Sequence, residues 1–157
     1  MRRKDREVTD PLKIKEVISN CQCCRLGLCD EGDVYIVPMS FGFEEQDGHY
    51  TLYFHSAAAG RKIDLMKRNP HVGFEMDTSY ELHLADTACE CGCAFQSVIG
   101  SGKVTFLEDK EEKTAALKAL MKQTTGREDW APFQEDMLKV VCVFKLDVEE
   151  LACKIHL

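Results

Sequence analysis

The sequence predicts a mainly β domain, in which six short strands form a small closed barrel and helices flank it on the outside. Six segments show the period-2 alternation, or the β-branched and aromatic content, that is typical of strands. Short turn signals at 30–33 and 46–48 connect several of them as hairpins. Gly100 and Gly102 lie inside the longest segment and permit the sharp bending that barrel strands need. Closure would leave no open strand edges.

The first part of the chain predicts one helix and two strands. Asp10 is the expected N-cap and Pro11 the first helical residue. The apolar stripe of this helix consists of Ile14, Val17, Ile18 and Cys21. Residues 25–29 and 34–43 follow as strands. Pro38 lies inside the second strand, so we expect an edge or a bulge there, where backbone groups are free to meet a ligand.

The middle of the chain predicts three further strands. Residues 50–55 alternate as a strand, and a short helix then runs from about Gly60 to the stop at 69–70. Residues 72–77 alternate as a half-buried strand. Residues 81–93 are poorly periodic, so we expect a connection there. The long strand at 95–107 carries the two glycines of the predicted bend.

The last part of the chain predicts a helix and the sixth strand. Asp109 begins a capping box, and the helix after it should end before Gly126. A loop and a further helical turn are expected up to about residue 138. Residues 140–148 form the last main strand, and the tail at 151–157 is expected to pair with it.

Length and composition indicate a single soluble domain over residues 1–157. The net charge of −7 argues against general binding to nucleic acids or anionic membranes, because both require basic surfaces. The charged N-terminus does not resemble a signal peptide, and no apolar run is long enough to span a membrane. We therefore expect a cytoplasmic protein, whose nine cysteines are mostly reduced.

The connection between the 50–55 strand and the next helix has the features of an anion site. Residues 56–60 are all small, so a ligand could approach their backbone. Arg61 and Lys62 follow in the first helical turn, where the helix dipole opposes each cation by roughly 0.3–1 kcal/mol. Two cations at this end of a helix make sense if an anion such as phosphate lies between them. The alternative is an exposed helix start with incidental charges.

Several stretches of the chain agree in order and spacing with one known family. They are Cys-Arg-Leu-Gly-Leu (24–28), Tyr-Ile-Val-Pro-Met-Ser-Phe-Gly-Phe (35–43), Tyr-Phe-His-Ser-Ala-Ala-Ala-Gly-Arg-Lys-Ile-Asp-Leu (53–65), Gln-Ser-Val-Ile-Gly-Ser-Gly-Lys-Val (96–104) and Leu-Met-Lys-Gln-Thr-Thr-Gly (120–126). Together they resemble the split-barrel flavoproteins of the pyridoxamine 5′-phosphate oxidase-like group. Within that group they are most similar to the Nim-type, 5-nitroimidazole-resistance branch.

This resemblance implies a six-stranded antiparallel split β-barrel that forms a homodimer, with FMN bound non-covalently at the subunit interface. The FMN-binding residues that it implies are Val37, Met39, Ser40, His55, Ser56, Arg61, Lys62, Gln96 and Ser97. Arg61 and Lys62 match the pair that grips the phosphate. Gln96 and Ser97 match a strand that meets the flavin from the other side, and Gln96 replaces the arginine that is usual in the Nim branch.

The implied activity is that of an FMN-dependent oxidoreductase, a nitroreductase acting on nitroimidazoles or other small aromatic substrates. His55 is the catalytic candidate, because a histidine can supply a proton near neutral pH as the flavin delivers electrons. The alternative for His55 is a structural contact with the cofactor. The substrate-binding residues of pyridoxamine 5′-phosphate oxidase itself have no match, so oxidation of vitamin B6 is not expected.

Three alternatives remain open from the sequence. The protein could bind flavin without turnover, or it could bind haem with His55 as an axial ligand. It could also be a metal–thiolate protein, because thiols cluster at 21–24 and at 89–93. Neither cluster has the spacing of a zinc ribbon, so we predict no metal. Trp130 is expected to plug one end of the core, with contact to the flavin as its alternative role.

Overall fold

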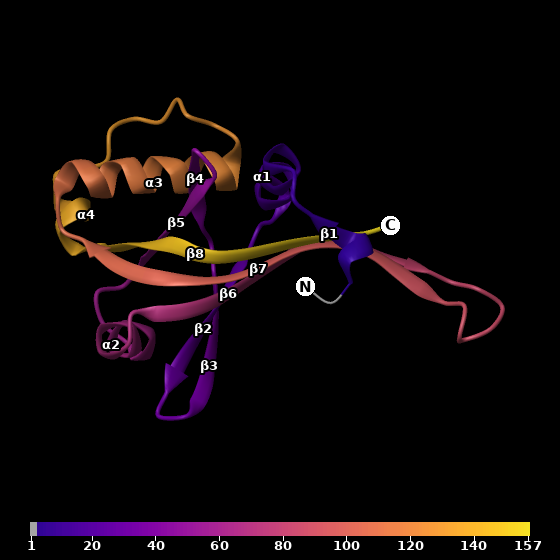
Figure 1. Ribbon diagram of the computed structural model, residues 1–157. Coiled ribbons are helices and arrows are strands. Elements are labelled where there is room, and N and C mark those ends of the chain that lie inside the picture. Colours follow the sequence, from indigo (N-terminus) through magenta and orange to yellow (C-terminus); the bar gives the residue numbers. More distant parts are fainter. Residues whose placement is uncertain (1–2) are drawn as a thin grey trace.

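The computed structural model describes residues 3–157. Eight strands lie in this part of the chain: β1 (Glu7–Val8), β2 (Cys24–Asp30), β3 (Asp33–Met39), β4 (Gly42–Gln46), β5 (His49–Ser56), β6 (His71–His83), β7 (Gly92–Leu107) and β8 (Cys142–His156). The helices are the 3-10 helix η1 (Lys4–Arg6) and the α-helices α1 (Pro11–Asn20), α2 (Arg61–Arg68), α3 (Lys110–Thr125) and α4 (Glu135–Val140). The predicted mainly β class with flanking helices is therefore confirmed (Figure 1).

The strands form one antiparallel sheet that turns back on itself. Its hydrogen-bonded order is β3-β2-β6-β7-β8-β5-β4, with β1 paired to β8. The two ends of this path, β3 and β4, are separated in the chain by only residues 40–41. The sheet must therefore curl until its edges meet, although β3 and β4 do not pair. Residues 40–41 connect the two edges of the barrel covalently, but no strand pairing joins β3 to β4. The barrel is therefore split between these two strands.

The helices begin and end where local chemistry predicts. The Asp10 side chain accepts a hydrogen bond from Leu12 N at 3.0 Å and so caps α1, whose first residue is Pro11. Asp109 caps α3 by accepting from the backbone N–H groups of the second and third helical residues. Gly126 ends α3 in the left-handed conformation, with φ of 70°.

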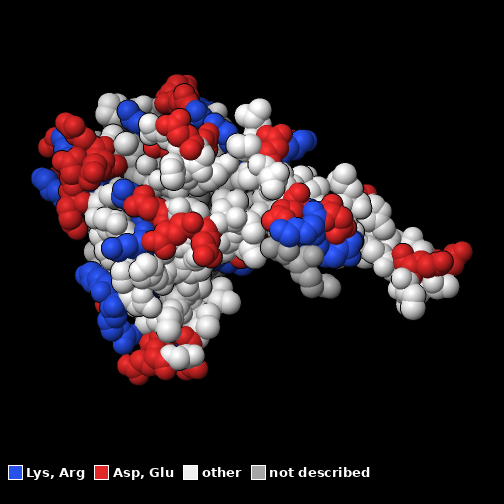
Figure 2. All heavy atoms as spheres, viewed as in Figure 1, with Lys and Arg blue, Asp and Glu red and all other residues white. Residues whose placement is uncertain are grey.

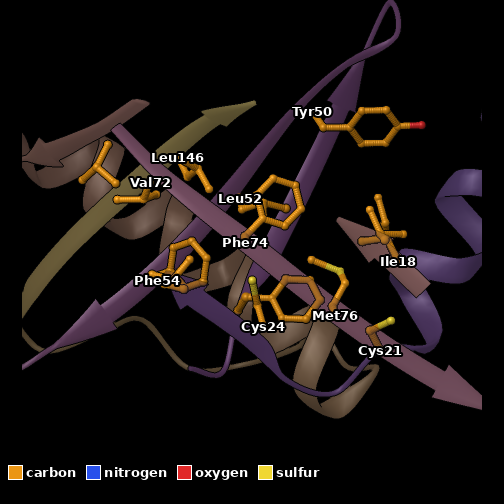
Figure 3. Packing of buried hydrophobic residues seen from close by; sticks show 14 of the residues in the cluster. Ile18, Cys21, Cys24, Tyr50, Leu52, Phe54, Val72, Phe74, Met76 and Leu146 are labelled. Carbon is orange, nitrogen blue, oxygen red and sulfur yellow. The ribbon is translucent and has the colours of Figure 1, made fainter. Parts of the chain in front are cut away.

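The core lies inside the curled sheet and under α1 and α2. Alternate residues of β5 and β6 point inward, among them Leu52, Phe54, Phe74 and Met76. Phe54 stacks on Phe144 of β8 with the ring centroids 5.2 Å apart. Figure 3 shows side chains from strands distant in sequence meeting in this cluster, with Ile18 of α1 beside them.

The predicted strand at 34–43 is in fact two strands. The chain leaves β3 after Met39 and enters β4 at Gly42, and the two have different partners, β2 and β5. Phe41 is buried at the corner between them, because its ring fills the core where the sheet closes. Pro38 lies on β3, an end strand of the sheet path, so the expectation of an edge is confirmed. This division and the short β1 raise the strand number from six to eight.

Two other boundaries also differ from the prediction. The segment 81–93 is only partly a connection, because β6 continues to His83 and β7 already begins at Gly92. The sixth strand and the tail form a single strand, β8, which begins at Cys142 and follows β7 through an irregularity opposite Ser101 and Gly102. Trp130 does not plug the core, since 43% of it is exposed.

Candidate functional site

The predicted anion site lies where β5 passes into α2. Gly60 is the N-cap of α2 with φ of 131°, a conformation that favours glycine. Its carbonyl oxygen accepts from Ile63 N at 2.9 Å and from Asp64 N at 3.2 Å. Residues 57–60 are exposed, so a ligand could approach the first turn without obstruction from large side chains. The small-residue corner thus opens the N-terminus of an eight-residue helix to solvent.

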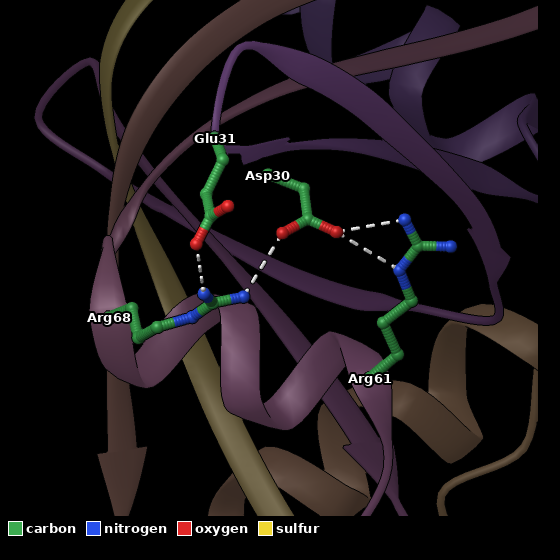
Figure 4. Close-up of polar contacts among 4 residues, drawn as sticks. All are labelled: Asp30, Glu31, Arg61 and Arg68. Atoms are coloured by element: carbon green, nitrogen blue, oxygen red, sulfur yellow. Dashed lines mark hydrogen bonds and ion pairs between the residues drawn. The ribbon is translucent and has the colours of Figure 1, made fainter.

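Arg61 is held in place by two neighbours (Figure 4). Its Nε and Nη2 atoms donate to Asp30 Oδ2, at 3.2 and 2.8 Å. Its guanidinium carbon also lies 4.5 Å from the centre of the Tyr35 ring. Because Asp30 takes the Nε side of the guanidinium, the Nη1 group remains available for a second, external anion.

Asp30 connects the two ends of α2 electrostatically. Its other carboxylate oxygen, Oδ1, accepts from Arg68 Nη2 at 3.0 Å. The hydrogen bond from Arg61, aided by the charges of both arginines, holds the pKa of Asp30 below its usual range. Figure 2 shows this arrangement at the surface, with basic side chains beside α2 and acidic ones at the β2–β3 turn.

Lys62 differs from Arg61 in having no acidic partner within residues 3–157. Its side chain is half-buried in the first turn of α2. A cation at the positive end of a helix, without a counter-ion, favours an anionic ligand. The residues present therefore fit a phosphate group: one fixed guanidinium, one unpaired ammonium and an open helix N-terminus.

The residues predicted to lie along a flavin follow β3 away from this anion site. Tyr35, which contacts Arg61, Val37 and Met39 are half-buried on one face of β3. Ser40 is exposed just after the strand ends. Tyr35, Val37 and Met39 pack against the core cluster with this face, and Tyr35 links it to Arg61.

His55 and Ser56 end β5 immediately before the small-residue corner. His55 is exposed and shares a face with Tyr53, as the alternation predicted, and it lies opposite Val143 of β8. The Ser56 hydroxyl donates to the Ala57 carbonyl oxygen at 2.7 Å, so it does not cap α2. Both residues adjoin the anion site without contributing to its cap.

Gln96 and Ser97 lie apart from the other predicted site residues of the same chain. They are on β7 opposite Ile155 and Lys154, with Ser97 also opposite Asp77 of β6. Strands β2 and β6 separate them from β3 in the sheet. Measured along the strands, Gln96 and Ser97 are level with the start of β2. Arg61 contacts Asp30, the last residue of β2, so about 20 Å separates Arg61 from these two residues in the strand direction. One chain alone does not assemble the full predicted set.

Sequence reasoning missed the residues that orient Arg61. The sequence marks Asp30 only as part of a turn, and it indicates no role beside Arg61 for Tyr35 or Arg68. The one available signal was that a cation at a helix N-terminus needs an acid nearby. The chain has 27 acidic residues, so that signal does not select Asp30 without the fold.

The nine cysteines differ in their exposure. All nine are free, and no group of three or more His, Cys, Asp or Glu side chains arranged to hold a metal occurs within residues 3–157. Cys89 and Cys91 are exposed near the tip of the β6–β7 hairpin, whereas Cys21 and Cys24 are buried. The metal–thiolate alternative therefore gains no support from the described part of the chain.

A cavity of about 1050 Å³ lies elsewhere, between α3, β4 and the loop that contains Trp130. Lys118, Lys122 and Phe43 are among its lining residues, and none of the predicted FMN-binding residues is. In the described chain, 3–157, no helix has the length and apolar character to cross a membrane.

Comparison with known proteins identifies the family. The family model described as pyridoxamine 5′-phosphate oxidase matches residues 10–155. The structure of a candidate 5-nitroimidazole antibiotic resistance protein from Bacteroides thetaiotaomicron is 32% identical, with a TM-score of 0.81, and the match covers 95% of this chain and 86% of that one. A comparison with curated proteins gives no match.

Two more distant structures share the fold. The flavocytochrome Anf3 from Azotobacter vinelandii is 19% identical, with a TM-score of 0.79 over 100% of this chain and 72% of that one. An FAD- and haem-binding protein from Mycobacterium smegmatis is 14% identical, with a TM-score of 0.81 over 96% and 73%. The predicted split-barrel fold is confirmed by these likenesses. With a family match over most of its length and a relative at 32% identity, this chain belongs to the pyridoxamine 5′-phosphate oxidase family.

Proposed function

We propose that the protein is a cytoplasmic, FMN-binding oxidoreductase of the nitroreductase type, which acts as a homodimer on small nitroaromatic substrates. The observation that carries this proposal is the pair Arg61–Lys62 at the open N-terminus of α2. Arg61 is oriented and keeps Nη1 available, and Lys62 has no acidic partner among residues 3–157. A terminal phosphate monoester carries a double negative charge, which would compensate the positive charges of Arg61 and Lys62.

The remaining residues of the site suit the rest of such a cofactor. The half-buried face of β3 with Val37 and Met39 offers an apolar surface to a ring system, and Ser40 offers a polar group at its end. A bound flavin would supply two-electron redox chemistry. His55, exposed beside the small-residue corner, is the candidate to donate a proton to the substrate as it is reduced.

A second subunit is needed to complete this site. Gln96 and Ser97 lie about 20 Å along the strands from Arg61, and two strands separate them from β3. Because β2 and β6 separate them from β3, we assign them to the cofactor that Arg61 and Lys62 of a partner chain bind. The exposure of His55, Ser40 and the corner at 57–60 in the single chain supports a site at an interface.

The first test measures binding of FMN. The protein as purified, or after addition of excess FMN, should show the visible absorbance of a bound flavin. Changing Arg61 and Lys62 together to Ala should weaken FMN binding by about 10²- to 10⁴-fold, because charge-assisted contacts contribute roughly 1.5–3 kcal/mol each. The control is Lys67→Ala plus Lys118→Ala, which removes the same charge at exposed positions away from the first turn. Equal losses in both variants would contradict a specific phosphate site.

The second test measures turnover. NAD(P)H and a nitroimidazole are supplied to the FMN-loaded protein, and the loss of both is followed together. Coupled consumption supports the reductase. Flavin binding with no turnover across a range of nitro compounds would instead favour the non-catalytic flavin protein. A Soret band without flavin absorbance would identify a haem protein and overturn the choice of cofactor.

A further inference from the structure

A second cavity, of about 310 Å³, lies at the end of the barrel where α2 and α4 come near each other (Figure 1). Its walls come from the small-residue corner, from α2, from the end of β7 and from the start of β8. Apolar side chains form much of these walls, among them Ile63, Phe106 and Val143. Of its lining residues within 3–157, three are lysines and one, Glu108, is acidic. The cavity therefore combines apolar walls with an excess of positive charge.

Lys113 of α3 brings a buried cation to this cavity, since only 8% of the residue is exposed. Its ammonium group donates to the carbonyl oxygens of Leu138 at 3.2 Å and Val141 at 3.3 Å, at the C-terminal end of α4. These carbonyls carry partial negative charge and compensate the ammonium group in part. No carboxylate within residues 3–157 pairs with Lys113. A buried positive charge without a counter-ion is costly, so the site favours an anion.

The ammonium group of Lys113 also keeps one N–H available. A lysine has three donors, and the two carbonyls of α4 take two of them. Lys113 and Val141, which accepts one of these bonds, both line the cavity. The third donor can therefore reach a ligand inside it. A ligand that accepts one hydrogen bond and carries one negative charge would supply both of the partners that Lys113 lacks.

Other cations lie around the same cavity. Burial raises the pKa of the Cys142 thiol in its wall, whereas the nearby charges of Lys113, Lys67 and Lys62 act to lower it. Glu108 acts against these lysines, but its side chain is exposed to solvent. The charges of three lysines from two helices thus reach one part of the cavity wall.

This cavity is distinct from the phosphate site at Arg61. Arg61 and Arg68 face the turn between β2 and β3, where both donate to Asp30. At roughly 100° per residue, Ile63 and Lys67 lie on the far side of the α2 axis from Arg61. Both of these residues line the cavity, and Arg61 does not. The two anion-favouring regions therefore flank α2 on different sides.

We propose that this cavity binds a small organic carboxylate. One carboxylate oxygen accepts from Lys113, and the apolar body of the ligand packs against Phe106 and Val143. A single free donor suits a carboxylate, whereas a phosphate dianion has further oxygens that the apolar walls would leave without partners. The inference goes beyond the proposed function and does not depend on it, because no step of it uses the flavin.

The test uses benzoate, which joins one carboxylate to a small apolar ring, and benzamide, its neutral counterpart of similar shape. Binding to the full chain is measured by calorimetry, with and without excess FMN. Lys113→Met removes the ammonium group and keeps most of the side-chain length. It should weaken benzoate binding about 10- to 100-fold, because a charge-assisted hydrogen bond is lost. Lys118→Met, at an exposed position of the same helix outside this cavity, should change it less than about threefold.

A second measurement on the wild-type protein locates the ligand. Benzoate should shift the methyl resonances of Ile63 and Val143, which line the cavity, and benzamide should bind at least about tenfold more weakly than benzoate. These two results decide the matter even if Lys113→Met fails to fold.

Several outcomes would overturn the inference. They are the absence of saturable benzoate binding, equal losses in the two methionine variants, and methyl shifts confined to other parts of the chain. Displacement of benzoate by FMN would show that benzoate had entered the phosphate site at Arg61. Tighter binding of inorganic phosphate in this cavity would refute the carboxylate class. Failure of FMN to bind would refute the proposed function and would leave the benzoate result standing.

Discussion

Arg61 acquires its role from the two residues that restrain it. Asp30 receives two of its donors through one oxygen, and Tyr35 supports the guanidinium plane from 4.5 Å. A free arginine side chain would lose up to about 2 kcal/mol of rotamer entropy when it binds a ligand. Here much of that loss occurs on folding. The site is therefore prepared for an anion, and the charge of Arg61 alone does not describe its contribution.

This arrangement predicts that Arg61→Lys impairs FMN binding although it conserves the charge. Lysine can neither reproduce the planar contact with Tyr35 nor donate from two nitrogens to Asp30. Contacts of this kind contribute about 1–2 kcal/mol together, so the FMN dissociation constant should rise about 5- to 30-fold. Lys62→Arg is the matched exchange, and it should change the constant by less than about threefold. Equal effects of the two exchanges, measured by flavin fluorescence titration, would mean that only charge matters.

Individual strands have shapes that particular glycines make possible. A Cβ atom on Gly102 would overlap the carbonyl oxygen of Asp147 in β8, and one on Gly100 would lie 2.6 Å from ring carbons of Phe74. Both positions adjoin the irregularity in the β7–β8 register. The bend expected from the sequence is thus explained by close packing of backbone against backbone and ring.

Gly102→Ala should therefore destabilise the protein, because the added methyl group meets backbone that cannot move aside. The expected loss is about 1–3 kcal/mol in the free energy of unfolding, as for other overpacked positions. Gly92→Ala is the control, since no atom lies within 4 Å of its Cβ position and its φ is not in the left-handed region. Its effect should stay within about 0.5 kcal/mol. Urea denaturation of both variants measures the difference, and similar midpoints would contradict the steric argument.

The helices could be predicted from sequence because their signals are local. The end of a helix leaves backbone groups without helical partners, and nearby residues compensate for this. They are Asp10 and Pro11 at the start of α1, Asp109 at the start of α3 and Gly126 at its end. The division between β3 and β4 could not be predicted, because the alternation of apolar residues continues across 34–43. The break occurs where the Phe41 side chain is buried in the core, which depends on the tertiary fold. For the site, residue order placed Arg61 and Lys62 at the start of a helix. Their partner Asp30 is 31 residues from Arg61, and only the fold brings the two together.

At the scale of the whole molecule, the least predictable feature was the hairpin of β6 and β7. Its strands extend into the segment 81–93, where the sequence predicts only a connection. Residues 79–92 are exposed, so burial within residues 3–157 imposes no strong hydrophobic pattern on them. The predicted flavin residues fall into two separate groups, which the proposed homodimer would bring together from different chains.

The barrel core also makes the stability of the whole molecule sensitive to alkaline pH. Burial raises the pKa of the Cys21 thiol to about 12 and that of Cys153 to about 11, from an ordinary value of 9.0, and raises that of Cys24 as well. The folded state retains protons that the unfolded chain releases above pH 9. This stabilisation is fully present below pH 9 and is lost as the pH rises through about 11 for Cys153 and about 12 for Cys21.

The free energy of unfolding, measured by urea denaturation in the presence of a reductant, should therefore decline between pH 9 and pH 11. Each buried thiol contributes a slope of up to about 1.4 kcal/mol per pH unit. Lysine and tyrosine groups also titrate in this range, so the comparison must be made between variants. Cys153→Ala should lower stability at pH 7 but flatten the decline, because one retained proton is removed. Cys29→Ala changes an exposed thiol and should preserve the wild-type slope. Parallel curves for all three proteins would show that the buried thiols do not control the alkaline limit of this fold.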